Sequence, residues 1–236
     1  MENIENDIIE ALESFKDIKR FEFSKNYYPT AMRVIGVTVP NSRIVLKELK
    51  YKTIAWPDIE KIQLAKKLIE SNIFECQQIA FEFVAKDKKT LKKMTHDDFI
   101  ELGKNLDNWI SVDTYSIYLL GYAWRNGIID DVEIKSFLKS TNHWRRRIAV
   151  VATVGLNLKS HGGKGDAKRT IEICELVVHD HHQMIVKALS WALRELSKRE
   201  KLPVQGFIEK YHDQLHSKVI REVTTKLETG KKNGVY

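Results

Sequence analysis

Three segments of the sequence place a tryptophan and a charged residue one helical turn apart. Residues three or four positions apart lie on the same face of a helix, so each pair would present an indole ring and a charge together. A single tryptophan of this kind usually packs a helix against its neighbour. Repetition instead favours a groove in which indole rings lie beside phosphate-binding cations. The pairs are Trp109 with Asp113, Trp144 with Arg147, and Trp191 with Arg194.

Asp113 is the only acid among these pairs, and it lies in an otherwise apolar segment. Two structural roles are open to it: the N-cap of a helix beginning at Thr114, or a core acid paired with a lysine. The catalytic alternative is an acceptor beside a developing positive charge, because a fixed carboxylate stabilises such a charge without reorganisation. The same carboxylate could orient a water molecule for attack.

The segment 184–198 is the clearest amphipathic helix of the chain. Its apolar positions recur at helical spacing, which predicts one buried stripe. An adjoining stripe carries the tryptophan and its charges. The apolar stripe consists of Ile185, Leu189, Ala192 and Leu196, and the adjoining stripe of Lys187, Trp191, Arg194 and Glu195.

The positive charge of the chain is concentrated in one region. The 236 residues carry a formal net charge of +7. Residues 139–201 contain thirteen Lys and Arg against six Asp and Glu, a surplus equal to that of the whole chain. A basic block within helices that also contain tryptophans indicates a polyanionic partner. The alternative is a solvated, lysine-rich surface.

Several classes of protein are disfavoured by composition. No run approaches the eighteen apolar residues of a membrane span. The amino-terminal segment is acidic and amphipathic, unlike a signal peptide. Cys76 and Cys174 lie among apolar neighbours and are expected to be small buried hydrophobes in a reducing cytoplasm. We therefore expect a cytoplasmic protein that is not associated with a membrane.

Helical periodicity dominates the chain, and strand signals are nearly absent, so the predicted fold is all-α. Residues 33–40 are expected to be an extended connector, with Asn41 or Ser42 capping the next helix. The midpoints of the more apolar helices recur at roughly 32 to 39 residues, a spacing typical of stacked helical hairpins. This predicts a single-domain solenoid of HEAT-like hairpins over residues 1–230, with a concave basic groove, and a disordered tail at 231–236. The expected helices span about 2–14, 42–50, 56–71, 74–86, 96–106, 111–126, 130–140, 143–159, 166–180, 184–198, 202–215 and 217–230.

Two further motifs have structural interpretations. The residues His179, Asp180, His181 and His182 fit no standard zinc spacing, and Asp180 is expected to cap the following helix, so no metal site is predicted. The glycine-rich segment 161–165 lacks the longer P-loop pattern and follows a helix rather than a strand. It is expected to be a flexible loop between repeats.

Three motifs together resemble the bacterial AlkD-type DNA alkylation repair glycosylases, which are built from HEAT-like repeats. They are WISVD at 109–113, NHWRRRIAV at 142–150 and KALSWALREL at 187–196, with a weaker match in IGVTVPNSR at 35–43. The resemblance extends over nearly the whole chain. Its most specific part is the Lys-Ala-x-x-Trp-x-Leu-Arg-Glu element.

The resemblance implies roles for particular residues. Asn108 and Ile110 depart from the family, which typically has a second aromatic or polar residue there, so the fine shape of the pocket is left open. Tyr27 falls where the family has an aromatic near the lesion. The implied catalytic residues are Asp113, Trp109 and Trp191, and the implied DNA-binding residues are Arg147, Tyr27, Arg43, Trp144, Arg146, Lys187 and Arg194.

The implied activity is hydrolysis of the N-glycosidic bond of cationic alkylated purines in duplex DNA, without flipping of the base and without metal or organic cofactor. Two indole faces and a carboxylate suit a sugar that becomes cationic. A bacterial, monomeric protein that needs no protein partner is expected. The alternatives are a non-catalytic relative that binds DNA by its structure, and a helical-repeat scaffold for protein interactions.

Overall fold

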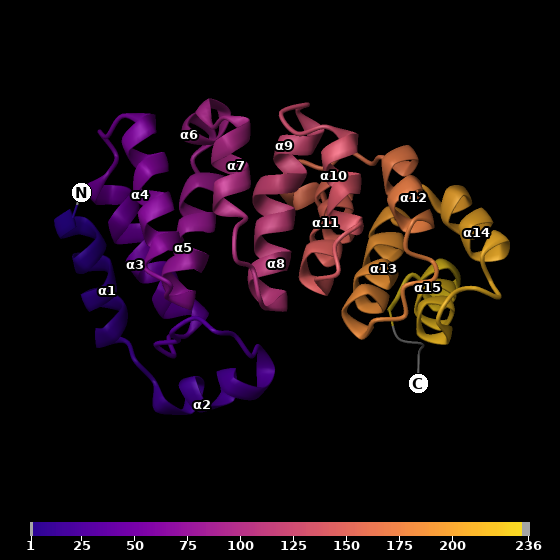
Figure 1. Ribbon diagram of the computed structural model, residues 1–236, viewed down its shortest axis with the longest axis horizontal. Helices are drawn as coiled ribbons and strands as arrows, with labels where there is room; N and C mark the ends of the chain where they lie inside the picture. The colour runs from indigo at the N-terminus through magenta and orange to yellow at the C-terminus, as the bar shows by residue number, and fades with distance from the viewer. Residues whose placement is uncertain (1, 233–236) are drawn as a thin grey trace. The chain divides into compact units, whose positions relative to one another are not determined.

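The computed structural model describes residues 2–232, and apart from one isolated β-bridge every regular element in this range is a helix (Figure 1). The all-α prediction is therefore confirmed. The chain divides by its contacts into two compact units, Met1–Tyr115 and Ser116–Tyr236. Whether they act as one domain stays a prediction. Of the predicted tail, residues 233–236 lie outside the described residues.

The first unit is organised around α5, which packs against α1, α3, α4, α6 and α8. Most of its side chains are buried, including Ile79, Phe81 and Phe83, because apolar residues occupy nearly every face of this helix. The helices of this unit are α1 (Glu2–Ser14), α2 (Ile18–Tyr27), α3 (Val39–Lys52), α4 (Asp58–Glu70), α5 (Phe74–Ala85), α6 (Lys88–Lys93), α7 (His96–Leu102) and α8 (Trp109–Tyr115).

The connector between α2 and α3 is extended, as predicted. Arg33 forms an isolated parallel bridge with Ile73. Further along, the Glu75 carboxylate accepts hydrogen bonds from the backbone N–H groups of Ile35, Gly36 and Val37, at 3.0, 2.8 and 3.1 Å. A buried acid on α5 therefore satisfies the donors of a segment that has no strand partner there.

The cap of α3 differs from the prediction. Thr38, not Asn41 or Ser42, adopts the extended N-cap conformation, and its hydroxyl accepts from the N–H of Asn41. The helix therefore begins at Val39, with Pro40 in its first turn, where a missing N–H costs nothing. Thr38 lies three residues before Asn41 and has the extended backbone that an N-cap requires, so the helix begins earlier than predicted.

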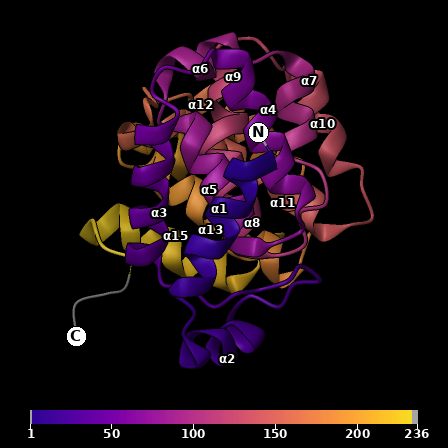
Figure 2. The same ribbon diagram turned by 90° about the vertical axis from the view of Figure 1, so that its left-hand side faces the viewer.

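Helix α2 lies at one end of the other helices of the first unit, apart from their main stack (Figures 1 and 2). Its start approaches the connector closely at Gly36, which has φ of +93°. A Cβ at this position would come within 2.7–2.8 Å of Phe21 and of the Asp17 carbonyl. Glycine is therefore required both by the positive φ and by the lack of space for a side chain.

The second unit has a regular alternation of packed helices. α11 packs against α13 and α13 against α15, while α12 packs against α11, α13 and α14. This arrangement confirms the expectation of a helical-repeat fold. The elements are the π-helix Ser116–Leu120, α9 (Gly121–Arg125), α10 (Asp131–Leu138), α11 (His143–Asn157), the 3₁₀ turn Lys159–His161, α12 (Ala167–Glu175), α13 (Gln183–Leu196), α14 (Lys201–Lys210) and α15 (Ser217–Thr229).

The helix expected at 111–126 is interrupted. After α8 the backbone passes through the π-helix before α9 begins. Next to it, a Cβ on Gly121 would approach the Cα of Gly155 to 2.9 Å, so glycine at this position lets two backbones nearly touch. The loop predicted at 161–165 is confirmed except at its first residue: His161 ends the 3₁₀ turn, and residues 162–166 without helix lead to α12.

Both cysteines are buried and free, as expected. Burial raises the pKa of the Cys76 thiol to about 12, so this thiol is not activated as a nucleophile. Within residues 2–232 no helix combines the length and apolar character needed to cross a bilayer.

Candidate active site

The first turn of α8 is fixed by Asn108. Its side-chain oxygen accepts from the Ser111 N–H at 3.0 Å, and its amide donates to the Ser111 hydroxyl, also at 3.0 Å. This is N-cap geometry, so α8 begins at Trp109. The departure of Asn108 from the family pattern therefore corresponds to a buried capping residue rather than to a group that faces a ligand.

Trp109 is the first residue of α8, and its ring is only partly buried. Its indole N–H donates to the backbone carbonyl of Tyr27 at 2.8 Å. The Tyr27 ring meets the indole edge-on, with centroids 5.2 Å apart. Trp109 also packs against a small buried cluster of Tyr28, Met32 and Phe74. These contacts hold the indole in one orientation beside the end of α2.

Asp113 lies one turn further along α8, inside the helix, and only 9 % of it is exposed. The N-cap alternative for this residue is therefore wrong, because the helix begins four residues earlier. Its position brings a buried carboxylate onto the same helix face as Trp109. An acid in this position experiences a low local dielectric, which strengthens its interaction with a nearby cation.

Two residues that the sequence analysis did not single out position this site. Asp107 accepts from the Thr30 hydroxyl and from the Ala31 N–H, each at 2.6 Å, and so ties the segment after α2 to the start of α8. Gln78 on α5 donates to the Ser111 hydroxyl at 3.1 Å and accepts from the Thr114 hydroxyl at 3.0 Å. In the sequence, the signal for this arrangement is the pair Asp107 and Asn108 just before Trp109, because residues of these types commonly mark the start of a helix.

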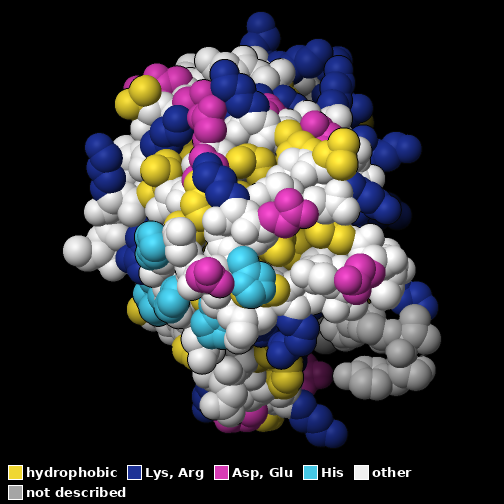
Figure 3. Space-filling view, turned by 90° about the vertical axis from the view of Figure 1, so that its right-hand side faces the viewer, with side chains coloured by type: hydrophobic (Ala, Val, Ile, Leu, Met, Phe, Trp, Pro, Cys, Tyr) yellow, Lys and Arg dark blue, Asp and Glu magenta, His cyan; other side chains and the backbone are white. Residues whose placement is uncertain are grey.

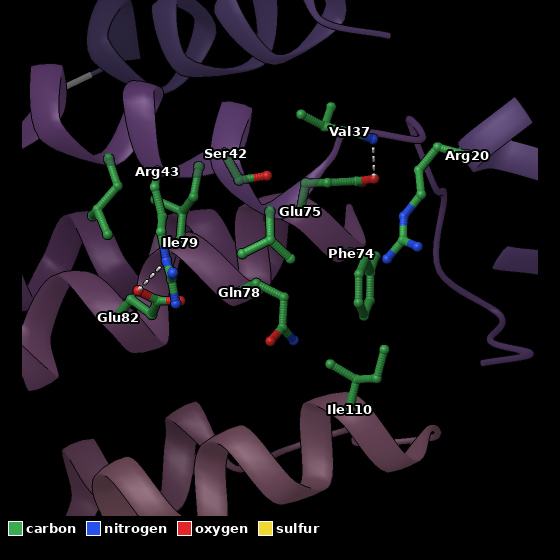
Figure 4. Close-up of a pocket in the computed structure, with 12 residues that line it drawn as sticks. Arg20, Val37, Ser42, Arg43, Phe74, Glu75, Gln78, Ile79, Glu82 and Ile110 are labelled. Carbon is green, nitrogen blue, oxygen red and sulfur yellow. Dashed lines mark hydrogen bonds and ion pairs between the residues drawn. The ribbon is translucent and has the colours of Figure 1, made fainter. Parts of the chain in front are cut away.

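Arg43 lies on α3, beside a cavity of about 90 Å³ in the first unit (Figure 4). Its side chain is mostly exposed, and its Nε is 3.9 Å from a Glu82 carboxylate oxygen. Arg20 lies at the other end of the cavity, and the walls between them are mainly apolar. Among the residues that line it are Phe74, Ile79 and Ile110. The cavity thus shares Phe74 and Ile110 with the surroundings of Trp109.

On α11 of the second unit, the predicted basic residues make internal contacts. Asn142 caps the helix by accepting from the Trp144 N–H. Arg146 donates to Asp180 at 2.6 Å and to the backbone carbonyls of Ser140 and Thr141. Arg146 therefore has a structural role: it links the start of α11 to the segment before α13.

Arg147 is almost fully buried, with 5 % exposure, and its guanidinium donates to the Met184 carbonyl at the start of α13. Trp144, one turn earlier, is partly buried, and its ring lies 4.5 Å from that of His143. Trp144 and Arg147 therefore both lie on α11, as expected, but the indole ring of Trp144 is more accessible to solvent than the guanidinium of Arg147.

Helix α13 presents the expected stripe. Lys187 is exposed and Trp191 is partly buried one turn later. Arg194 follows, but it is held by Ser190 at 3.2 Å and by Glu222 of α15 at 3.7 Å. Desolvation lowers the pKa of Arg194, and Glu222 opposes this effect. Lys187 is thus the most accessible cation of this stripe.

Histidine side chains gather on the face of the second unit seen in Figure 3. In this unit His143 stacks on His182 at 4.1 Å, and His181 meets His216 edge-on at 6.1 Å. His182 is the N-cap of α13, so the prediction that Asp180 caps this helix is wrong. The Asp180 carboxylate instead accepts from the His182 N–H and from Arg146.

The predicted site residues fall into two groups, one in each unit. The first unit brings Tyr27 and Trp109 into contact, with Asp113 on the next turn and Arg43 at the neighbouring cavity. The second unit carries the rest on two packed helices, α11 and α13. These residues are Trp144, Arg146, Arg147, Lys187, Trp191 and Arg194.

The fold and these side chains define a helical-repeat protein with an aromatic and acidic candidate site. The family of DNA alkylation repair enzymes matches residues 8–227, and the chain belongs to that family. No curated protein gives a significant match. A solved chain described as a predicted DNA alkylation repair enzyme from Enterococcus faecalis has a similar fold. Its TM-score is 0.71 at 17 % identity, over 91 % of this chain and 97 % of that one.

Proposed function

We propose that this member of the family is a DNA glycosylase that removes positively charged alkylated purines, chiefly N7-alkylguanine and N3-alkyladenine, from duplex DNA. The observation that carries the proposal is the pairing on α8 of a fixed, partly exposed indole with a buried carboxylate one turn away. A protein that binds DNA only by its shape needs cations but not this acid.

The reaction is the replacement of the glycosidic C1′–N bond by a bond from C1′ to a water oxygen. The bond electrons leave with the base, whose positive charge they neutralise, so little protonation of the leaving group is required. Positive charge develops on the sugar as the bond breaks. Asp113 would stabilise this charge, or orient the attacking water and take up the proton that the water releases.

The indole rings contribute through their electron-rich faces, which attract cations. Trp109 supplies one ring, and in this proposal Trp191 of the second unit supplies the other. Both rings are partly accessible on their own units. Because the lesion already carries the charge that weakens the bond, the proposal needs no metal or organic cofactor and no extrusion of the base into a pocket.

DNA binding is assigned to the remaining predicted residues. Arg43 and Lys187 are the more accessible cations of the set. Each phosphate that they neutralise releases counterions, so affinity should fall steeply with salt. A monomer binding duplex DNA without a protein partner is sufficient for this activity.

The test is incubation with methylated duplex DNA, followed by chromatography of the released bases. Asp113→Asn keeps the size of the side chain but removes its charge. We expect this variant to fold, to bind duplex DNA nearly as the parent does and to lose most base release. Release of 7-methylguanine at the parent rate would remove Asp113 from the mechanism. Duplex binding by the parent without any base release would instead identify a DNA-structure-binding relative.

A further inference from the structure

Helix α2 turns three of its four large apolar side chains toward solvent, all but Phe21. Ser24 is its one buried residue, whereas Ile18 is 73 % exposed and Phe23 and Tyr27 are each 48 % exposed. An amphipathic helix normally buries its apolar side chains. An exposed apolar face next to a candidate site indicates a binding surface rather than a core contact.

The exposed rings form a continuous series. The centroids of Phe23 and Tyr27 are 4.7 Å apart, and those of Tyr27 and Trp109 are 5.2 Å apart. The series therefore leads from the middle of α2 to the first residue of α8. The hydrogen bond from Trp109 to the Tyr27 carbonyl fixes one end of it.

A cation lies against this series. The Arg20 guanidinium is 5.1 Å from the centre of the Phe23 ring and 5.9 Å from that of Tyr28. Its Nε is buried and has no hydrogen-bond partner within residues 2–232. The α2 sequence carries three bases, Lys19, Arg20 and Lys25, against the single acid Glu22, which pairs with Lys25.

The combination of exposed rings and positive charge is selective. An apolar protein helix gains from aliphatic area, but it offers no anion to these cations. An anionic lipid offers a headgroup phosphate, but it has no flat π-surface to stack on the rings. DNA offers both a flat π-surface in each base and a phosphate beside it, and aromatic rings flanked by cations are the usual platform for unpaired bases. The rings and the cations together therefore favour nucleic acid as the occupant.

We propose that Phe23 and Tyr27 form a stacking platform for an unpaired nucleobase of the bound DNA, with Arg20 beside its phosphate. Phe23 is thereby a binding residue of this protein. The inference rests on the proposed function in one respect: removal of an alkylated base leaves the base on the opposite strand unpaired, which supplies an unpaired base near the site.

The test compares two oligonucleotide duplexes that differ in one position, where 2-aminopurine is either paired or an unpaired bulge. Stacking on a ring quenches the fluorescence of 2-aminopurine, so binding and stacking are measured together. We expect Phe23→Ala to weaken binding of the bulged duplex by about tenfold and to abolish the quenching, while the paired duplex changes less than about twofold. Phe23→Trp should retain both.

Two further variants separate stacking from other effects. Tyr51→Ala removes an aromatic side chain that is 80 % exposed on α3 of the same unit. It should change neither the affinity for the bulged duplex nor the quenching of 2-aminopurine. Phe23→Leu keeps apolar area but loses the ring, and it should behave like Phe23→Ala. Parent affinity in Phe23→Leu, or equal losses for both duplexes in Phe23→Ala, would overturn the platform.

A competing occupant gives its own result. If the parent protein sediments with phosphatidylcholine–phosphatidylglycerol vesicles and Phe23→Ala abolishes this while leaving the bulged duplex bound, the face is a lipid contact and the inference fails. The base-release assay tests the proposed function independently of the platform. Quenching that depends on Phe23, without release of any base, would contradict only the glycosylase proposal. Base release by the parent, with no effect of Phe23→Ala on binding of the bulged duplex, would contradict only the platform.

Discussion

The indole Nε1 of Trp109 donates a hydrogen bond to the backbone carbonyl oxygen of Tyr27, 2.8 Å away, although 82 positions separate the two residues. This bond makes the orientation of a candidate catalytic ring depend on where α2 ends. The segment after α2 is in turn held by Asp107, the residue two positions before Trp109. The end of α2 and the segment after it are thus both hydrogen-bonded to residues at the start of α8.

Asp107→Ala should loosen this connection. The carboxylate accepts from the Thr30 hydroxyl and the Ala31 N–H, and hydrogen bonds to a charged acceptor are worth about 1.5–3 kcal/mol each. Because Asp107 is only partly buried, water replaces part of both bonds when the carboxylate is removed. We therefore expect the free energy of unfolding to fall by about 2 kcal/mol, less than the sum for two buried bonds, measured by urea denaturation, and base release to fall more than duplex binding. The control is Asp97→Ala, at a largely exposed acid, which should change neither. Unchanged base release in Asp107→Ala would mean that the site tolerates a mobile α2.

The sequence was sufficient to predict most of the helices, because their apolar spacing reflects burial. It did not predict α2, which buries only Ser24, or α6, a six-residue helix of mostly lysines, because neither shows a regular apolar stripe. The amphipathic segment predicted at 184–198 is α13, and the predicted helix 2–14 is α1. Helix caps were predicted less well. Thr38 and His182 serve in place of Asn41 or Ser42 and of Asp180, because several residues of cap-forming type adjoin each start and only backbone geometry selects one.

The candidate site was predictable only in part. Pairs within one helix, such as Trp109 with Asp113, follow from spacing. The Tyr27–Trp109 contact and the support from Asp107 and Gln78 join residues 33 to 82 positions apart, and no local pattern encodes them. The internal bonds of Arg147 were missed for the same reason, since a basic residue in the sequence does not reveal that its charge is buried.

Glu75→Gln tests the connector that leads to α3. The buried carboxylate accepts three backbone N–H groups from residues 35–37, and a glutamine would turn an amide donor toward at least one of these donors. We expect a loss of about 3 kcal/mol or more in the free energy of unfolding, by urea denaturation. Glu48→Gln, at an exposed position of α3, is the matched control. Equal stabilities of the two variants would show that the connector does not depend on the charge.

The stacked histidines of the second unit predict a pH dependence of stability. Burial lowers the pKa of His143, and His182 and Arg146 lower it further, while Asp180 opposes them. The unfolded chain, with a histidine pKa of about 6.5, therefore binds this proton more readily than the folded protein. The stability that neutral His143 contributes is present above about pH 6.5 and is lost as the pH falls through its lower folded-state pKa.

The measurement is urea denaturation at about pH 8 and pH 5.5, compared between the parent and His143→Gln. Glutamine cannot titrate, so the variant should lose less stability over this interval than the parent. The same loss in both proteins would assign the pH dependence to other groups.

Lys187→Ala tests whether α13 faces DNA. Lys187 is exposed and forms part of the same stripe as Trp191, so its removal should leave the melting temperature unchanged. If it neutralises one phosphate, duplex affinity should fall to a similar extent for all sequences, and the slope of log affinity against log salt should decrease by about one. Lys210→Ala removes the same charge from an exposed residue of α14 that pairs with Glu175, and it should leave the salt slope intact. If the two variants lower the slope equally, the effect is one of total charge, and α13 has no special role in binding.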